Sequence, residues 1–403
     1  MKFNAGVAST TLLDTELAGK TIAGEALSRA GIKHADFAFL IISDAHDYDI
    51  FLKAVQSVLG KQTVIAGGSS IGIVTNDALV TEGASAAIMV IAADEMHFTT
   101  EITPGLSEGE ELCGRKTGKK LKQLLKAENP NLILFYDGLG PTKVDGVKFI
   151  GATPILKGIG SEIGDWPPTA GVGLVTLSWA NCKLWNEDLI SGGSIMSLII
   201  SGNIRMDTTI MHGCKPASDY HKITGISENV ILEIDGKPAT DVVIEHLGNP
   251  AEIDWKSAPF FITLGMNKGD KYGPFREEDY VNRMVMGVDE KRKGLDVVDV
   301  DFQVGDEFQF MRRSIEPGIV SGQSHRLLNS LTGRKPLFAL YISCAGRIKK
   351  LYGSEKEEAE EVQEALGDLP LIGMYSGVEI ARVKNKLMPL DWTGVLCVFS
   401  EPV

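Results

Sequence analysis

Cysteine is scarce in this sequence, and no two cysteines stand in a recognisable motif. The chain has five in 403 residues, an odd and widely scattered set without a C-x-x-C pair. A disulfide framework needs paired cysteines and a zinc knuckle needs closely spaced ones, so both are excluded. The composition fits a reducing compartment, and we expect the protein in the cytoplasm. The five are Cys113, Cys182, Cys214, Cys344 and Cys397.

Long apolar runs and a leader segment are also missing. The longest clean apolar runs have the length of strands, whereas a membrane-spanning helix needs about 18 or more apolar residues in succession. Residues 1–10 contain neither the basic segment nor the apolar core of a signal peptide. We therefore expect neither secretion nor a membrane partner.

A basic face is absent as well. The formal net charge is -13, from 40 Lys and Arg against 53 Asp and Glu. Such a chain repels a phosphate backbone unless a basic surface stands apart from the average. The densest basic stretch, residues 115–126, is interspersed with apolar and polar residues, as solvated helix faces are. We expect no nucleic-acid partner.

None of the common catalytic signatures is complete. Residues 19–21 (Gly-Lys-Thr) resemble the end of a P-loop, but Asp14 stands where that motif needs a glycine. Gly158 and Gly160 are followed by Ile163, where the dinucleotide fingerprint needs its third glycine. No H-E-x-x-H helix or catalytic carboxylate pair is visible. We expect a protein that is not an enzyme and holds no metal.

What the sequence does contain is one pattern that occurs three times. The first copy starts with an apolar strand at residues 37–42 and continues through a helical pattern at 48–59. A second strand then runs into the turn at residues 67–70, and the strand 85–92 closes the unit. Buried strands joined by a crossover helix are typical of a mixed sheet covered on both faces.

The other two copies follow the same order. The last has a strand at 337–342, a helix at 355–366, a turn at 375–377 and a closing strand at 393–400. The middle copy has a strand at residues 132–136, and we expect a glycine turn within 154–163, a closing strand at 171–178 and a short or missing helix. The fold class predicted is α/β, with mixed β-sheets, flanking helices and pseudo-repeated units.

A region of different character lies between the middle and last copies. Residues 191–313 show short alternating strands, an Asp235-Gly236 turn and a charged segment. We place a domain boundary near residues 190–200, where this region begins. We therefore expect two domains, residues 1–195 and 196–403.

The candidate site begins with the segment that ends the first strand of the last copy. Cys344 stands at a carboxyl end of a buried strand, where α/β sheets open their ligand crevices. Gly346 lets Arg347 approach closely, and this arginine can lower the pKa of the thiol or pair with a ligand carboxylate. The alternative is structural, with Cys344 a small buried apolar side chain and Arg347 an ion-pair partner.

The next strand of the same copy ends in further candidate residues. Tyr375, Ser376 and Glu379 occupy the turn that follows it. Because neighbouring strands end at one edge of a sheet, Cys344 and Tyr375 are expected to converge on one pocket. Glu379 can orient Arg347 or bind an amine, or it has a structural role.

The first copy offers a second set of ligand-binding candidates. Its turn consists of Gly67, Gly68, Ser69 and Ser70, whose amides and hydroxyls can hold a polar ligand group. A purely structural turn is the alternative. Among the seven scattered histidines, His212 is the one to follow because a glycine stands beside it, although a hydrogen-bonded surface histidine is the favoured interpretation.

Together these residues resemble the FIST family, whose name denotes F-box and intracellular signal transduction proteins. The resemblance covers nearly the whole chain and includes an N-terminal and a C-terminal half. It implies a sensory module for small ligands such as amino acids, often fused to a kinase, cyclase or chemoreceptor output. The segments that carry it are residues 4–9, 67–70, 132–137, 213–216, 233–239, 344–347 and 373–380.

The resemblance also leaves alternatives open. The two halves account for the whole of this sequence, so we expect the signal to pass to a separate partner protein. Some relatives bind haem and respond to nitric oxide, and a haem-based gas sensor is one alternative. An enzyme with Cys344 as nucleophile is a second, although no base for it is visible, and an interaction scaffold is a third.

Overall fold

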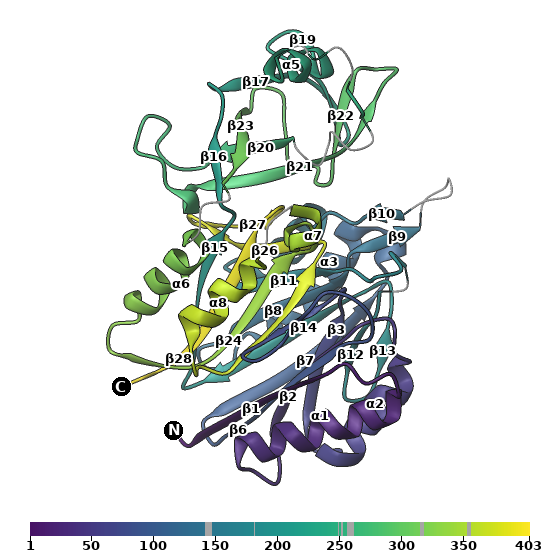
Figure 1. Cartoon of the computed structure of the whole chain (residues 1–403), viewed down its shortest axis with the longest axis vertical. Coiled ribbons are helices and arrows are strands. Elements are labelled where there is room, and N and C mark those ends of the chain that lie inside the picture. Colours follow the sequence, from purple (N-terminus) through teal and green to yellow (C-terminus); the bar gives the residue numbers. More distant parts are fainter. Residues whose placement is uncertain are drawn as a thin grey trace.

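Three six-stranded β-sheets form the larger part of the chain, and a β-barrel forms most of the rest (Figure 1). This mixed α/β architecture confirms the predicted fold class. No helix among the described residues is long and apolar enough to cross a membrane. The structure, a computed structural model, describes residues 1–141, 147–180, 182–248, 250, 253–255, 262–314, 318–352 and 356–403.

The first sheet contains the first copy of the repeat. Its spatial order is β1 (Phe3–Thr10), β6 (Ala86–Ala93), β2 (Phe37–Ile42), β3 (Val64–Ser69), β12 (Leu184–Asn186) and β13 (Ile190–Ser191). α1 (Thr15–Ala30) and α2 (Tyr48–Leu59) cover its outer face, and each starts at an aspartate that accepts a backbone N–H. Along β2 the side chains of Leu40 and Phe39 point to opposite cores. Both faces of the strand are covered, which is why its sequence is apolar throughout.

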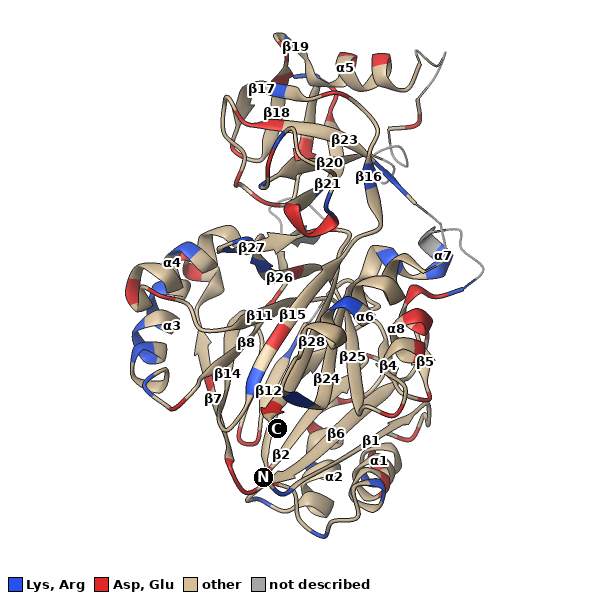
Figure 2. Cartoon of the chain, turned by 90° about the vertical axis from the view of Figure 1, so that its left-hand side faces the viewer, with Lys and Arg blue, Asp and Glu red and all other residues tan. Residues whose placement is uncertain are grey.

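The second sheet contains the middle copy. Its order is β7 (Met96–Pro104), β14 (Ser194–Gly202), β8 (Asn131–Asp137), β11 (Thr169–Leu174), β26 (Val378–Val383) and β27 (Lys386–Leu390). α3 (Glu110–Leu124) and α4 (Thr153–Ile163) cover its outer face, and the short η1 (Leu106–Glu108) precedes α3. The basic stretch found in the sequence lies on α3 (Figure 2), where Lys116 and Lys120 pair with nearby glutamates. β9 (Leu139–Pro141) and β10 (Val147–Phe149) form a separate two-stranded ribbon.

The third sheet contains the last copy. Its order is β15 (Arg205–Met211), β28 (Gly394–Pro402), β24 (Arg334–Cys344), β25 (Leu371–Ser376), β4 (Ile73–Thr75) and β5 (Leu79–Val80). Its helices are α6 (Ile319–Ser330), η4 (Ala345–Arg347), α7 (Lys349–Tyr352) and α8 (Glu358–Leu366). α8 begins at Glu357, which forms a capping box with Glu360. The expected first residue of this helix, Glu355, lies outside the described residues.

Each sheet is completed by a hairpin from another copy. β4–β5 of the first copy pairs with β25 of the third sheet, and β26–β27 of the last copy pairs with β11 of the second sheet. β12–β13 of the middle copy pairs with β3 of the first sheet. The three exchanges form a closed ring with pseudo-threefold topology. The division into residues 1–195 and 196–403 stays a prediction, and strands of each part pair with strands of the other.

The barrel is inserted between β15 and α6. Its order is β16 (Cys214–Pro216), β23 (Glu307–Arg313), β17 (His221–Ser227), β18 (Val230–Ile234), β22 (Gly294–Val297), β21 (Tyr280–Asp289) and β20 (Thr263–Asn267), with β19 (Lys237–Pro238) beside β18. Pairing of β20 with β23 closes it. α5 (Ala239–His246) and η3 (Glu277–Asp279) complete this part. The predicted turn is confirmed, because Asp235 and Gly236 both have positive φ between β18 and β19.

The middle copy was predicted wrongly. Residues 153–163 form α4, the crossover helix that was expected to be short or missing, and β11 is the second strand of the unit. The closing strand is β14 rather than residues 171–178. Gly158 lies in α4, where α3 packs against it. The residue is a glycine because a Cβ at this position would overlap the Glu111 carbonyl of α3. The glycine lets the two helices pack closely and does not mark a turn.

The glycines of the first-copy turn also have packing reasons. A Cβ on Gly67 would overlap the carbonyl oxygen of Leu40 on the neighbouring strand. A Cβ on Gly68 would lie 2.7 Å from Leu174 Cδ1. Both positions are buried, so neither neighbour can move into solvent.

We predict that Gly67→Ala destabilises the protein by about 1–3 kcal/mol or more, because the added methyl group meets backbone that cannot yield. Gly24→Ala is the matched control, since nothing lies within 4 Å of a Cβ there and the residue is inside α1. That control should gain about 0.5–1 kcal/mol. Urea unfolding of both variants measures the difference, and equal stability of the two would contradict this packing account.

Candidate functional site

The predicted residues at the edge of the third sheet lie next to one another. β24 and β25 are parallel, and their register places Ser343 beside Tyr375 and Cys344 beside Ser376. Ser376 Oγ donates to Glu379 Oε1 at 2.6 Å and also lies 3.0 Å from the Ser343 carbonyl oxygen. All of these side chains are buried. The structure therefore brings four of the predicted site residues together at the end of two strands.

The turn of the first copy meets the same edge. Ser70 Oγ accepts the Tyr375 N–H at 3.0 Å and lies 2.9 Å from the Tyr375 carbonyl oxygen. Ser69 Oγ accepts the Lys183 N–H at 3.1 Å. These contacts join the three copies, so the polar groups of residues 67–70 are used inside the protein. The turn lies at a buried junction, and it does not open into solvent.

A surface hollow of about 590 Å³ lies beside Tyr375. Gly72 lies between Tyr375 and the backbone that lines the hollow. A Cβ on Gly72 would lie 3.0 Å from Thr81 Cα on one side and 3.1 Å from Tyr375 Cδ2 on the other. The hydroxyl of Tyr375 is buried and has no hydrogen-bond partner among the described residues. The lining consists of Leu79, Val80, Thr81, Glu82, Lys349, Lys350 and Glu357.

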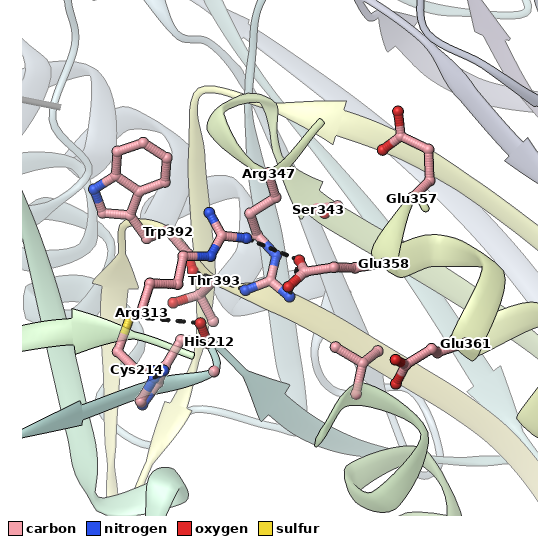
Figure 3. A network of polar contacts seen from close by, with 12 residues as sticks. His212, Cys214, Arg313, Ser343, Arg347, Glu357, Glu358, Glu361, Trp392 and Thr393 are labelled. Atoms are coloured by element: carbon pink, nitrogen blue, oxygen red, sulfur yellow. Dashed lines mark hydrogen bonds and ion pairs between the residues drawn. The ribbon is translucent and has the colours of Figure 1, made fainter. Parts of the chain in front are cut away.

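A buried ionic network joins Arg347 and Arg313 to Glu358, the residue that follows Glu357 of the lining (Figure 3). Arg347 follows β24 in η4, and its Nη1 donates to the Trp392 carbonyl oxygen at 3.0 Å. Its Nη2 lies 2.7 Å from Glu358 Oε2, and Arg313 Nη2 donates to the same oxygen at 2.9 Å. Gly346 is needed here because any Cβ would overlap the Trp392 ring. One carboxylate oxygen therefore holds two arginines.

Negative charge surrounds the buried end of Arg347. Arg347 is 1% exposed, and burial, the largest single effect, lowers its pKa, but Glu358 together with smaller contributions from Tyr341, Cys214 and Glu277 raises the pKa overall. Burial raises the pKa of Glu357 beside the hollow, which favours its neutral form. Among the described residues, Arg347 Nε and Trp392 Nε1 are buried without a hydrogen-bond partner.

A second buried cluster holds the chain where it enters the barrel. Glu277 Oε1 accepts the N–H groups of His212 and Gly213, the latter at 2.6 Å, and Glu277 Oε2 accepts from Gln323 Nε2 at 2.8 Å. His212 Nδ1 accepts the Cys214 N–H at 2.9 Å, and His212 Nε2 lies 3.0 Å from the Glu277 carbonyl oxygen. Burial lowers the pKa of His212, so the ring is neutral. His212 is thus a hydrogen-bonded histidine of the interior and not of the surface.

The chemistry expected of Cys344 and Glu379 differs from the prediction. Burial raises the pKa of the Cys344 thiol, and the charge of Glu379 adds to the effect. Arg347 therefore does not activate this thiol. Glu379 accepts from Ser376 and from the Thr393 N–H, and burial raises its pKa well above the ordinary value. Glu379 therefore accepts bonds within the third copy, and no bond from it to Arg347 is observed among the described residues.

Sequence reasoning missed Arg313, Glu358 and Glu277. Arg313 ends the last barrel strand and Glu358 lies in the first turn of α8, so 45 residues separate the two partners. The acidic start of α8 was visible in the sequence, but it has an adequate explanation in the helix dipole alone. The single usable signal was Arg347 itself, a charged residue directly after a buried strand.

A further polar contact joins the barrel to the segment between β27 and β28. Asp391 Oδ2 accepts the Met284 N–H at 2.9 Å, and Arg283 of the same barrel strand pairs with Asp301. Burial raises the pKa of Asp391 to about 7, and the charge of Asp299 adds to this shift. Among the residues that the structure describes, no three His, Cys, Asp or Glu side chains are grouped to hold a metal ion.

Three interlocked sheets, an inserted barrel and a buried arginine pair at their junction define a two-part α/β protein. The FIST N domain family matches residues 36–237, and the FIST C domain family matches residues 239–382. The chain therefore belongs to the FIST family, which is associated with sensing in signal transduction. The predicted resemblance is confirmed.

Relatives with similar sequences carry the name "uncharacterized protein". The protein Mb0898c of Mycobacterium bovis is 22% identical over 246 residues, which cover 59% of this chain and 62% of that protein. MT0656 of Mycobacterium tuberculosis is 22% identical over 48% of this chain and 51% of its own length. MJ1623 of Methanocaldococcus jannaschii is 19% identical over 40% of this chain and 31% of its own length. The chain thus spans less than two thirds of each of these relatives.

The solved structures that align with this chain have low sequence identity and low structural similarity to it. Cyanuric acid hydrolase from A. caulinodans has a TM-score of 0.38 at 8% identity, with both chains fully covered. PurL of T. maritima in complex with ADP has a TM-score of 0.23 at 10% identity, over 99% of this chain and 72% of that one. Scores this low carry no conclusion about the function of this chain.

We predict that Arg347→Ala destabilises the protein by about 3–5 kcal/mol, because it removes one partner from a buried ion pair. Lys350→Ala is the control, since Lys350 pairs with Glu82 in an exposed contact whose loss should leave the unfolding midpoint unchanged. Denaturant unfolding followed by circular dichroism measures both. Similar midpoints for the two variants would show that the buried network does not stabilise this junction.

We predict that Asp391→Asn changes the pH dependence of stability. Unfolded Asp391 titrates near 3.8 and folded Asp391 near 7, so between these values the folded state holds the extra proton. This group therefore favours folding at low pH, and its contribution falls as pH rises towards 7, by up to about 1.4 kcal/mol per pH unit. The difference between wild type and variant, measured by urea unfolding from pH 4.5 to 8, should show this slope. A constant difference would refute the shift.

Proposed function

We propose that this protein is a sensory protein that binds a small carboxylate-bearing ligand, such as an amino acid, at the Arg347 network. The observation that carries the proposal is the pair of buried guanidinium groups on one carboxylate oxygen. Guanidinium groups bind carboxylates in a defined geometry, and these two already hold the carboxylate of Glu358. Arg347 Nε and Trp392 Nε1 supply further donors beside the pair.

The neighbouring hollow supports the proposal by offering access. Glu357 lines the hollow, and the next residue, Glu358, holds Arg347. Lys349, two residues after Arg347, also lines the hollow. The volume of about 590 Å³ falls within the usual range of small-molecule sites. A ligand that enters here meets the polar end of the network first.

A binding role without catalysis fits the chemistry of these side chains. Burial raises the pKa of Cys344, so the thiol is not a ready nucleophile, and we propose no enzymatic function. His212 has both ring nitrogens engaged in protein contacts, which does not fit a haem ligand. We propose that the protein acts in the cytoplasm through a separate signalling protein, such as a kinase, a cyclase or a chemoreceptor.

Thermal unfolding in the presence of amino acids and other small carboxylates tests the proposal. A ligand at 100 times its Kd should add about 2.7 kcal/mol to the stability of the wild-type protein. Arg347→Lys should lose most of this gain, because a lysine cannot make the paired contacts of a guanidinium group. Arg326→Ala, an exposed arginine on α6, is the control that should keep it. No stabilisation by any carboxylate, or an equal gain in Arg347→Lys, would contradict the proposal.

A further inference from the structure

The first turn of α8 holds three different segments through three glutamates. Glu357 accepts the Lys349 N–H at 3.0 Å, at the start of α7. Glu358 holds both arginines of the network. Glu361 accepts two N–H groups at the start of α6, those of Gly318 and Ser321, each at 3.0 Å. The position of α8 therefore fixes the segments around the candidate site and the helix that follows the barrel.

From α6 the contacts continue to both chain crossings into the barrel. Gln323 of α6 donates to Glu277, and Glu277 accepts from the backbone of His212 and Gly213, which lead into β16. β16 pairs with β23 through Cys214 and Arg313. We call residues 212–214 and 313–314 the neck. An unbroken series of polar contacts thus joins Glu358 to the neck, directly through Arg313 and indirectly through α6.

Glu358 has the same chemistry as the proposed ligand. It presents a carboxylate to two arginines, and both contacts use one of its oxygens. Its side chain is 15% exposed, so rotation into solvent opens a path for exchange. A ligand carboxylate that takes over Arg347 and Arg313 replaces one charge-assisted pair by another, and no charge remains buried and unpaired.

We infer that Glu358 occupies the place of the ligand carboxylate in the free protein, and that the ligand displaces it and thereby releases α8 from the neck. This inference rests on the proposed function and adds its regulation. Glu358 then competes with the ligand for the two arginines. Only the fraction of molecules in which the Glu358 side chain has moved away can bind the ligand, and this lowers the apparent affinity. The signal is then a loosening of the neck, which changes how the barrel is held on the three sheets.

Glu358→Gln tests the inference, with acetate as the probe and chloride at equal ionic strength as the reference. The variant lacks the internal carboxylate, so it should bind acetate at least about tenfold more tightly than wild type, as measured by thermal unfolding. In chloride, its amides at Gly213, Gly318 and Ser321 should exchange with deuterium at least about tenfold faster than in wild type. Glu364→Gln, an exposed position on α8, is the matched control and should match wild type in both measurements.

The outcomes separate the two proposals. Carboxylate binding that depends on Arg347, without any gain in Glu358→Gln, overturns the displacement and leaves the proposed function standing. Faster exchange confined to α8 overturns the coupling to the neck. No response to acetate or to any larger carboxylate in either protein overturns both. Should Glu358→Gln not fold, Glu358→Asp is the second variant: its shorter side chain draws the internal carboxylate back from the arginines, so a smaller gain in acetate affinity is expected, and no gain would overturn the displacement.

Discussion

Two guanidinium groups buried close together need a negative charge between them. An unpaired buried charge costs several kcal/mol, so the Glu358 carboxylate fixes the loop after β24, the end of β23 and the first turn of α8 relative to one another. The surrounding features follow from this constraint. Gly346 lets the Trp392 ring lie against the backbone, and the Trp392 carbonyl then receives Arg347. These ions and hydrogen bonds attach the barrel to the sheets alongside apolar contacts, since one hydrophobic cluster includes buried residues of both parts.

The ring of exchanged hairpins explains why the site lies where it does. Because each sheet is completed by a hairpin of another copy, the strand ends of the three copies meet, and their polar groups bond to each other. Ser70 is hydrogen-bonded to Tyr375, and Ser376 is hydrogen-bonded to Glu379. The centre of the ring is therefore a rigid junction. The ionic network of Arg347 and Glu358 lies at the edge of the third sheet, where the inserted barrel contributes Arg313.

The sequence predicted those parts of the molecule that depend on local pattern. Continuous apolar runs such as residues 37–42 and 132–136 are strands because both faces are covered, and the threefold repetition is confirmed in the sheets. The middle copy was misread because Gly158 serves close helix packing, which looks like a turn in one dimension. The ion pair between Arg313 and Glu358 could not be predicted from the sequence, because it depends on how the barrel packs against the third sheet.

The central claim is that an external carboxylate binds between the two arginines of the network. Nuclear magnetic resonance of the arginine Nε–Hε groups, recorded while the most stabilising carboxylate is added, tests it directly. The account predicts that the signals of Arg347 and Arg313 shift together and saturate at one ligand per chain, while that of Arg283 at the other barrel contact stays in place. Shifts confined to exposed arginines, or unchanged signals from Arg347 and Arg313 at saturating ligand, would contradict it.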